Sequence, residues 1–332
     1  MQFRPMPTPG TASESSAPTP RFGAHMSVAG GLEHAFAAAR AAGCDSLQIF
    51  VRNQRQWSAR PLSQEQIDLF RSAALAGTGP AALAETGGAA MAGAGATSRP
   101  RKAAERDVYP VVAHASYLLN LASPDRGVRE KSIAAMIDEL TRCEALGVES
   151  LIFHPGAYMD GTLSAGIRRI VRSLDRVTAA TAGFRTLILL ESTAGQGSAI
   201  GHTFAQLGRI MAGVKAPARL GVCLDTCHLF AAGYDFRTVE GYEAMAAELD
   251  EHVGVAAVRC VHANDSKKPC GSRVDRHEHV GKGCIGKTGF AHFVRDGRWA
   301  GLPFILETPK GTDARGRDLD RVNLAALRRL VR

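Results

Sequence analysis

Residues able to bind a metal ion stand at the ends of short apolar runs that are typical of buried strands. Eight such runs occur, and seven of them end on His25, His114, His154, Glu191, Asp225, His262 or Glu307. A single residue of this kind is usually a hydrogen-bonded polar group. Many of them converging on one place would be unfavourable without a cation, because their charges would stay uncompensated. The pattern therefore predicts a metal site.

Two further units follow strand ends and enlarge the set of candidate ligands. Asp225 and His228 form an Asp-x-x-His unit, and Asp275 and His277 form an Asp-x-His unit in the loop after the seventh run. Imidazole nitrogen and carboxylate oxygen suit Zn²⁺ or Mn²⁺, and the several imidazoles argue against Ca²⁺. The set is too large for one zinc ion. It indicates two or three clustered ions, which are suited to phosphoryl chemistry.

The elements that must position these residues alternate between strand and helix patterns. The apolar runs cover 22–25, 46–51, 109–114, 150–154, 187–191, 220–225, 258–262 and 303–307. Helical patterns separate them, including a capping box of Ser63 and Gln66 and an apolar face that ends at Gly147. Eight strands, each followed by a helix or long loop, predict a single (β/α)₈ barrel, an α/β fold. A doubly wound sheet is the alternative, but no glycine-rich nucleotide loop follows the first run.

Cys223 and Cys227 have a spacing that zinc sites also use. Cys223 lies two residues before Asp225, so it should face the same side of its strand but deeper in the barrel. We expect it to pack there as an apolar side chain. The seven cysteines are scattered and odd in number, which favours a reducing compartment over a disulfide scaffold.

Composition narrows the class of protein. The 332 residues include 40 Lys and Arg against 32 Asp and Glu, an excess that favours a polyanionic partner such as nucleic acid. No apolar run reaches the roughly 20 residues of a membrane helix, so no membrane partner is expected. The N-terminal segment has no apolar centre and does not resemble a secretory signal, so we expect a cytoplasmic protein.

Two segments depart from the alternating pattern. Residues 1–20 are rich in Pro, Ser and Thr, and we expect a disordered tail before a catalytic domain that spans 21–332. Residues 73–97 are mostly Ala and Gly, and we expect a loose insertion. Because it follows the helix after the second strand, it should lie on the face opposite the strand C-terminal ends.

Several long blocks resemble one known family, endonuclease IV. They are GAHMSVAGG (23–31), IFVRNQRQW (49–57), HASYLLNL (114–121), FHPGAY (153–158), ESTAGQGS (191–198), GVCLDTCHLFAAGYD (221–235), VHANDSK (261–267), GSRVDRHEHVGKGCIG (271–286) and LETPKG (306–311). Endonuclease IV enzymes are zinc-dependent apurinic/apyrimidinic endonucleases of base excision repair. The resemblance runs from about residue 22 to the C-terminus, except for the insertion.

The resemblance implies the reaction and its partners. The substrate would be duplex DNA, cut at the phosphodiester 5′ to an abasic site to leave a 3′-hydroxyl and a 5′-deoxyribose phosphate. Blocked 3′ ends would also be removed, and the enzyme would act as a monomer. The mechanism would use about three Zn²⁺ ions, with Mn²⁺ as an alternative at one position, and Glu191 would orient the attacking hydroxide.

The resemblance also implies which residues hold each ion, and it does not include His25. The three ligand sets, in order, are His114, His154 and Glu191; Glu191, Asp225, His262 and Glu307; and His228, Asp275 and His277. Glu191 would bridge the first two ions. Ser192 stands where the family pattern has Asn, which puts a hydrogen bond around the ligands in doubt.

Three residues would enter the DNA at the lesion. The resemblance assigns this role to Arg55, in the loop after the second strand, and to Tyr117 and Leu118, after the third. Trp57 lies in the same segment as Arg55, and its side chain either packs or contacts DNA.

Two other classes of function remain as alternatives. A sugar isomerase or epimerase on the related xylose-isomerase-like barrel also gathers His, Asp and Glu around one or two metals. It would not need the Asp275 and His277 unit, the NQRQW loop or the positive charge. A DNA-damage binding protein without activity is the other class, but every ligand position is filled.

Overall fold

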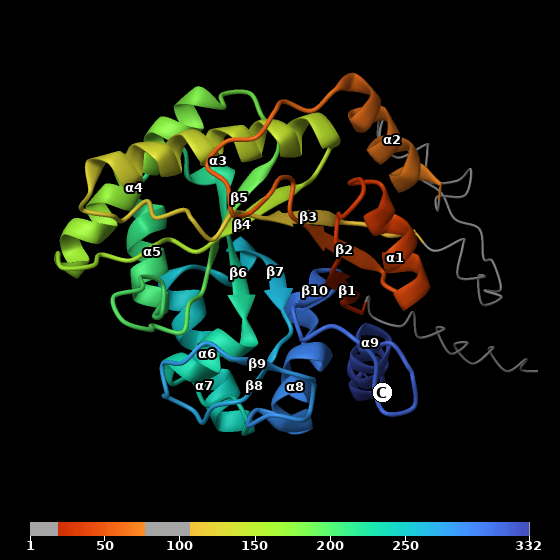
Figure 1. The fold of residues 1–332 in the computed structure, drawn as a ribbon. Coiled ribbons are helices and arrows are strands. Elements are labelled where there is room, and N and C mark those ends of the chain that lie inside the picture. Colours follow the sequence, from red (N-terminus) through yellow and green to blue (C-terminus); the bar gives the residue numbers. More distant parts are fainter. Residues whose placement is uncertain (1–18, 77–106, 332) are drawn as a thin grey trace, which may run out of the picture.

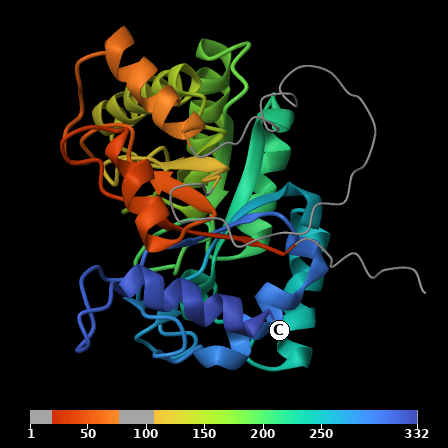
Figure 2. The same cartoon turned by 90° about the vertical axis from the view of Figure 1, so that its right-hand side faces the viewer.

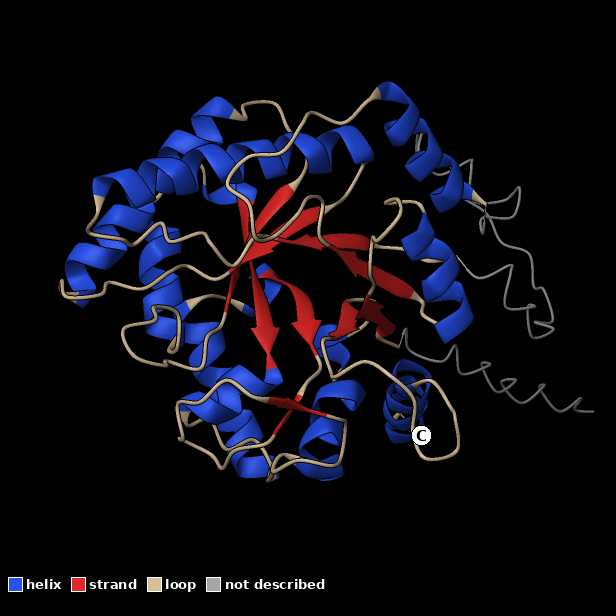
Figure 3. Cartoon of the chain, viewed as in Figure 1, coloured by secondary structure: helices blue, strands red, loops and turns tan. Residues whose placement is uncertain are grey.

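The computed structural model describes residues 19–76 and 107–331, and in it eight parallel strands close into a barrel. Hydrogen-bonded neighbours around the barrel follow the order β1-β10-β7-β6-β5-β4-β3-β2. Helices surround the strands on the outside (Figures 1 and 3). The predicted (β/α)₈ barrel is therefore confirmed, and the open doubly wound sheet is excluded.

The strands match the apolar runs closely. Their bounds are β1 (Arg21–His25), β2 (Ser46–Ile49), β3 (Val111–His114), β4 (Ser150–Phe153), β5 (Leu187–Glu191), β6 (Leu220–Asp225), β7 (Val258–His262) and β10 (Pro303–Leu306). The second run was expected to reach residue 51 but ends at Ile49. His154 and Glu307 stand one residue beyond their strands, so their side chains leave the sheet at the same edge as the other candidate ligands.

Helices separate the strands as expected, including one that follows the predicted capping box of Ser63 and Gln66 and one that ends before Gly147. Their bounds are α1 (His34–Ala42), α2 (Gln64–Leu75), α3 (Arg126–Leu146), α4 (Leu163–Ala180), α5 (Phe204–Gly213), α6 (Thr226–Ala232), α7 (Val239–His252), α8 (Gly286–Arg295) and α9 (Leu319–Leu330). Three short 3₁₀ turns are η3 (Pro217–Arg219), η4 (Val255–Ala257) and η5 (Gly297–Trp299). Helices α8 and α9 lie side by side on the outside of the barrel (Figure 2).

Two helix ends confirm the local signals. Ser63 and Gln66 form the predicted capping box at the start of α2. Gly147 adopts a left-handed conformation with φ of 78° directly after α3, and its N–H bonds to carbonyls of the last turn. Residues 73–75 belong to α2, so any loose insertion begins later than the expected residue 73. Residues 77–97 of that segment, and residues 1–18 of the expected tail, lie outside the described residues.

One layer of side chains fills the barrel interior and supports the candidate ligands. The layer, called the floor here, consists of Val112, Ile152, Leu189, Cys223, Cys260 and Ile305. Each floor residue lies two positions before a candidate ligand, and strand residues two apart point to the same face. The ligands therefore form the next layer toward the C-terminal ends. The floor includes Cys223, which confirms its expected place below Asp225.

A small antiparallel hairpin was not anticipated. Strands β8 (Asp265–Ser266) and β9 (His277–Glu278) pair within the long connection after β7, with Ser266 opposite His277. The hairpin brings the Asp-x-His unit back toward the barrel. Within residues 19–76 and 107–331, no helix has the length and apolar character needed to cross a membrane.

The supporting role of the floor predicts different effects for two residues that are adjacent in β5. Leu189 is a fully buried floor residue, whereas Ile188 is equally buried but belongs to the core outside the strands. Leu189→Ala and Ile188→Ala should each lower the free energy of unfolding by about 2–5 kcal/mol, because each leaves a cavity. Only Leu189→Ala should also weaken metal retention, since Glu191 stands directly above it. Denaturant unfolding and metal analysis after dialysis measure both effects. Equal metal retention in the two variants would contradict a supporting role for the floor.

Candidate metal centre

The structure brings the candidate ligands together in three groups at the C-terminal ends of the strands. Within each group the ligand atoms lie within 4.8 Å of one another. The groups are His114, His154 and Glu191; Glu191, Asp225, His262 and Glu307; and His228, Asp275 and His277. They coincide with the three sets that the family resemblance implies, and Glu191 belongs to two of them.

Glu191 lies at the centre of the arrangement, with its side chain fully buried. Its Oε2 lies 3.0 Å from His114 Nε2 and 3.1 Å from His154 Nε2, and its Oε1 lies 2.9 Å from His262 Nδ1. Burial alone would raise the pKa of Glu191, but the charges of His154 and His262 outweigh burial and hold the pKa well below its usual value. The carboxylate is thus ionised and presents an oxygen to each of two groups.

The orientation of His114 leaves a lone pair facing a carboxylate. Its Nδ1 lies 2.8 Å from the carbonyl oxygen of Ala115, which can only accept a hydrogen bond. Nδ1 therefore donates, and in the neutral ring Nε2 carries the lone pair. That nitrogen faces Glu191 Oε2. Two acceptors at this distance repel each other unless a proton or a cation stands between them.

His228 repeats the same arrangement in the third group. Its Nδ1 donates to the carbonyl oxygen of Ser192 at 2.9 Å, so its Nε2 faces Asp275 Oδ2 at 3.1 Å. Burial alone would lower the pKa of His228, but the charge of Asp225 and the contact with Asp275 raise it well above its usual value. A positive charge is therefore favoured at this nitrogen, which is what a bound cation supplies.

Gln48 fixes the orientation of His262. The Gln48 amide nitrogen donates to Glu307 Oε1 at 2.6 Å, and its oxygen lies 2.8 Å from His262 Nε2. His262 Nε2 must therefore donate, and its Nδ1 lone pair faces Glu191 and, at 3.3 Å, Glu307 Oε2. Burial alone would raise the pKa of Glu307, but the charge of His262 outweighs it and holds the pKa at about 2.

His25 has a different role from the residues that end the other strands. Its Nδ1 lies 3.0 Å from the Gln48 amide nitrogen, and it belongs to none of the groups. Burial lowers its pKa to about 3, so the ring is neutral and accepts a hydrogen bond from Gln48. His25 therefore supports the residue that orients His262. Gln48 itself was missed, although it is the only strongly polar residue in the run SLQIFV.

His277 provides the clearest sign that the groups suit a cation. Its Nε2 is buried and has no hydrogen-bond partner within the described residues. The same atom lies 3.3 Å from Asp275 Oδ1 and 3.7 Å from Asp225 Oδ2. A buried nitrogen that makes no hydrogen bond, although it lies at ion-pair distance from two carboxylates, is unfavourable in a bare protein. The donor set therefore fits divalent ions such as Zn²⁺.

Asp265 holds the loop that carries the third group. Its carboxylate accepts hydrogen bonds from the backbone N–H groups of Ser266, Gly281, Gly283, Ile285 and Gly286, at 2.8–3.3 Å. Position 283 requires glycine, because a Cβ there would lie 2.3 Å from the carbonyl oxygen of Ser266. One buried carboxylate thereby closes the connection from β8 to α8 and places Asp275 and His277.

Two other supporting residues stand around Asp225. Ser192, the departure from the family pattern, accepts a hydrogen bond at its Oγ from the Asp225 N–H at 2.9 Å. Asn264 donates from Nδ2 to Asp225 Oδ2 at 2.7 Å and accepts at Oδ1 from the Glu307 N–H. Asn264 was missed by the sequence reasoning, although it follows His262 by only two residues. Cys227 lies near Asp225 and His277, whereas Cys223 belongs to another group, so the two cysteines do not form a common metal site.

A cavity of about 440 Å³ opens beside the ligands. Tyr117 and Leu118 line it together with His154 and Asp275. Tyr117 is 65% exposed, which is unusual for a large aromatic residue, and its ring packs against Phe50 and His114 while the rest of it can contact a ligand. Leu118 is half-buried.

Buried hydrogen bonds connect the loop that carries Arg55 with the loop that carries Tyr117. Arg52 donates from Nε to Glu139 Oε1 at 2.7 Å, and both side chains are buried. Glu139 also accepts from the Ser116 N–H, and Ser116 Oγ donates to the Gln54 carbonyl oxygen. This network holds the loop after β2 against the loop after β3.

Arg55 and Trp57 differ in exposure within the loop after β2. The Arg55 side chain is exposed and does not line the cavity. Trp57 is partly buried and packs against the main core, as one of its two expected roles requires.

Comparisons with known proteins agree with one another. A family model described as xylose isomerase-like TIM barrel matches residues 36–330. A probable endonuclease 4 of Chloroflexus aurantiacus is 47% identical over 312 residues, which cover 94% of this chain and 98% of the relative. A probable endonuclease 4 of Geobacter sulfurreducens is 43% identical over 310 residues, which cover 93% and 94% of the two chains.

Solved structures give the same result. Endonuclease IV from Thermus thermophilus superposes with a TM-score of 0.75 at 34% identity, covering 94% of this chain and 99% of the other. A D-tagatose 3-epimerase-like protein superposes with a TM-score of 0.63 at 18% identity, covering 94% and 98% of the two chains, a likeness of fold alone.

The role of Asp265 can be tested with a near-isosteric change. Asp265→Asn should release the loop, because the new amide group would place its own N–H donors against backbone donors. We expect the metal content to fall by about one ion per chain, while the barrel and the other groups remain. Asp250→Asn, which removes a similar carboxylate that accepts from the Val255 N–H on the surface, is the matched control. Unchanged metal content in Asp265→Asn would show that the loop holds its shape without this carboxylate.

Proposed function

The chain belongs to the endonuclease IV family of the xylose isomerase-like barrels and is a DNA-cleaving hydrolase, and we propose that it repairs abasic sites in duplex DNA. In this proposal it hydrolyses the phosphodiester 5′ to the abasic site and leaves a 3′-hydroxyl and a 5′-deoxyribose phosphate. The observation that carries the proposal is the convergence of three ligand groups at one end of the barrel, two of which share Glu191. Removal of blocked 3′ ends, a monomeric state and a cytoplasmic location are part of the same proposal.

We propose that the groups hold about three Zn²⁺ ions, with Mn²⁺ as an alternative at one position. Support comes from the imidazole lone pairs that face carboxylates and from the unpartnered Nε2 of His277. Nitrogen and carboxylate oxygen are suitable ligands for both ions. When bound, such ions lower the pKa of water and stabilise charge on the entering and leaving oxygens of a phosphodiester.

Glu191 is the proposed catalytic residue. Its two oxygens point into different groups, so it can accept a hydrogen bond from an attacking water while staying ionised. The network around it keeps this geometry fixed, since His114 and His262 are each anchored through their second nitrogen. The chain thus supplies a preorganised base that can orient the attacking water.

Recognition of the lesion is assigned to Arg55, Tyr117 and Leu118. An exposed aromatic ring beside a cavity of about 440 Å³ suits stacking against a base pair while a sugar-phosphate without a base enters the cavity. Abasic DNA bends and unstacks at low cost, so its deformability contributes to selection. The excess of 40 Lys and Arg over 32 Asp and Glu favours binding to the phosphate backbone.

A sugar isomerase or epimerase is the alternative. It shares the barrel, as the 18% identical epimerase-like structure illustrates, but that likeness concerns the fold alone. Such a reaction would use one or two metals, so it would not need the third ligand group or the loop that Asp265 holds in place. Assays of an abasic oligonucleotide and of a panel of ketoses with the same preparation separate the two activities.

The proposed function is tested by a change at Glu191. Glu191→Gln should lower the rate of nicking of an abasic duplex on the order of a hundredfold or more, because a neutral amide is a poor metal ligand and cannot accept a proton from the attacking water. Metal analysis and nicking assays are made on the same samples, with and without a chelator. Glu240→Gln, an exposed glutamate in the first turn of α7, is the control.

Two outcomes would contradict the assignment. Activity of Glu191→Gln within about tenfold of the parent would remove Glu191 from the catalytic role. Full activity of the parent after complete removal of metal would remove the metal-dependent reaction altogether.

Lesion recognition is tested with residues of the same type on opposite faces. Arg55→Ala and Tyr117→Ala should raise the KM for abasic duplex by about tenfold and leave metal content unchanged, because stacking and phosphate contacts are lost. Arg185→Ala and Tyr109→Ala are matched controls. Both residues are exposed and precede the N-terminal ends of β5 and β3, on the face of the barrel opposite the metal centre. Equal KM values for Tyr117→Ala and Tyr109→Ala would show that the loop after β3 does not contact the lesion.

A further inference from the structure

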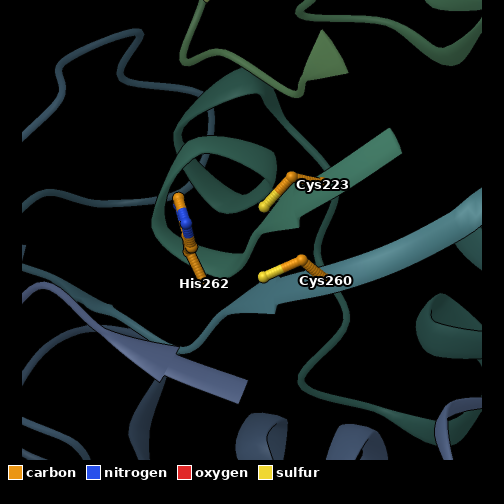
Figure 4. Close-up of side chains that lie close together, drawn as sticks. All are labelled: Cys223, Cys260 and His262. Carbon is orange, nitrogen blue, oxygen red and sulfur yellow. The ribbon is translucent and has the colours of Figure 1, made fainter. Parts of the chain in front are cut away.

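Two of the six floor positions carry thiols rather than aliphatic side chains. Cys223 on β6 and Cys260 on β7 are register partners on neighbouring strands, and both are fully buried. Figure 4 shows the two sulfur atoms pointing the same way, into the space beside the His262 ring. The other four floor residues are Val112, Ile152, Leu189 and Ile305, which offer no ligand atom.

The thiols form a compact donor set with His262. The Sγ atoms of Cys223 and Cys260 and a ring nitrogen of His262 lie within 4.8 Å of one another. Two sulfurs and one imidazole are soft and borderline donors, which prefer Cu⁺, Cd²⁺ and similar d¹⁰ cations. The three ligand groups of the hydrolytic centre are different, because they combine imidazole with carboxylate and contain no sulfur.

We propose that Cys223, Cys260 and His262 form a binding site for a thiophilic d¹⁰ cation, directly beneath the hydrolytic metal centre. On binding of a divalent ion, each thiol gives up its proton to solvent and forms one metal–sulfur bond, so two protons are released for each ion. Cys223, Cys260 and His262 are all fully buried, so bulk water has little access as a competing ligand. The inference concerns a second kind of site and does not depend on which DNA lesion is cut.

His262 couples this site to the hydrolytic centre. Its ring also faces Glu191 and Glu307, and its other nitrogen donates to Gln48. A cation bound by the floor thiols therefore competes with the second ligand group for the imidazole of His262. Capture of a thiophilic ion should weaken that group, so the site makes the enzyme sensitive to such ions.

One other thiol near the centre offers a competing site. Cys227 lies with Asp225 and His277 in a group that has a single sulfur. The number of sulfur neighbours around a bound ion therefore distinguishes the two locations. Cys284 is exposed on the surface, and Cys284→Ser is included in every protein compared so that it does not bind the probe.

The experiment is a titration of the metal-loaded enzyme with Cd²⁺, followed by the ultraviolet charge-transfer absorption of cadmium–thiolate bonds. We expect saturation near one ion per chain, and an affinity about a hundredfold weaker in Cys260→Val, which keeps the apolar floor but removes one sulfur. Cys143→Val is the matched control, because Cys143 is fully buried in α3 and belongs to no ligand group. The same absorption and affinity in Cys260→Val would overturn the proposal.

A second measurement on the protein with both floor thiols intact does not depend on how the variants fold. X-ray absorption at the cadmium edge should find two sulfur neighbours at the bound ion. A single sulfur would place the ion at a lone thiol such as Cys227, and none would place it in the carboxylate groups, so either result would overturn the proposal. Nicking should fall with added Cd²⁺ in the parent and resist it in Cys260→Val, and equal inhibition of both proteins would contradict the coupling through His262.

Discussion

The structure depends on one electrostatic constraint, the meeting of imidazole lone pairs and carboxylates at the mouth of the barrel. His114, His228 and His262 each use one nitrogen to donate to a neutral oxygen, of a backbone carbonyl or of Gln48. Their second nitrogens then face Glu191 or Asp275. Such an arrangement is stable only with a proton or a metal cation between the partners, so the residues that orient the imidazole rings also favour cation binding.

Successive strand residues point alternately into and out of the barrel, and this alternation links the ligand layer to the apolar layer beneath it. A floor residue and a ligand stand two positions apart on each of six strands, so the apolar floor sets the height of the ligand layer. Shifting any strand by one residue would turn both its floor residue and its ligand out of the barrel. Two requirements therefore fix the register of the sheet together. The floor residues must be buried, and the ligands must point into the metal centre.

The sequence predicted the parts that depend on periodicity and could not predict those that depend on contacts between distant residues. The eight strands, and the ligands at their ends, follow from apolar runs that terminate in His, Asp or Glu. The same pattern included His25, whose role as a support for Gln48 depends on a neighbouring strand. The hairpin that positions His277 was not foreseen, because it depends on backbone N–H groups that converge on Asp265 from a long loop.

The third ligand group differs physically from the first two, because strand ends hold those two while a loop supplies Asp275 and His277. Asp225 and His228 join the two parts. Asp225 Oδ1 caps α6 by accepting from the His228 N–H at 2.8 Å, which leaves Oδ2 for its own ligand group. The start of α6 favours negative charge, so it stabilises this carboxylate. A rearrangement of the loop can therefore alter the third group while α6 keeps Asp225 and His228 in place.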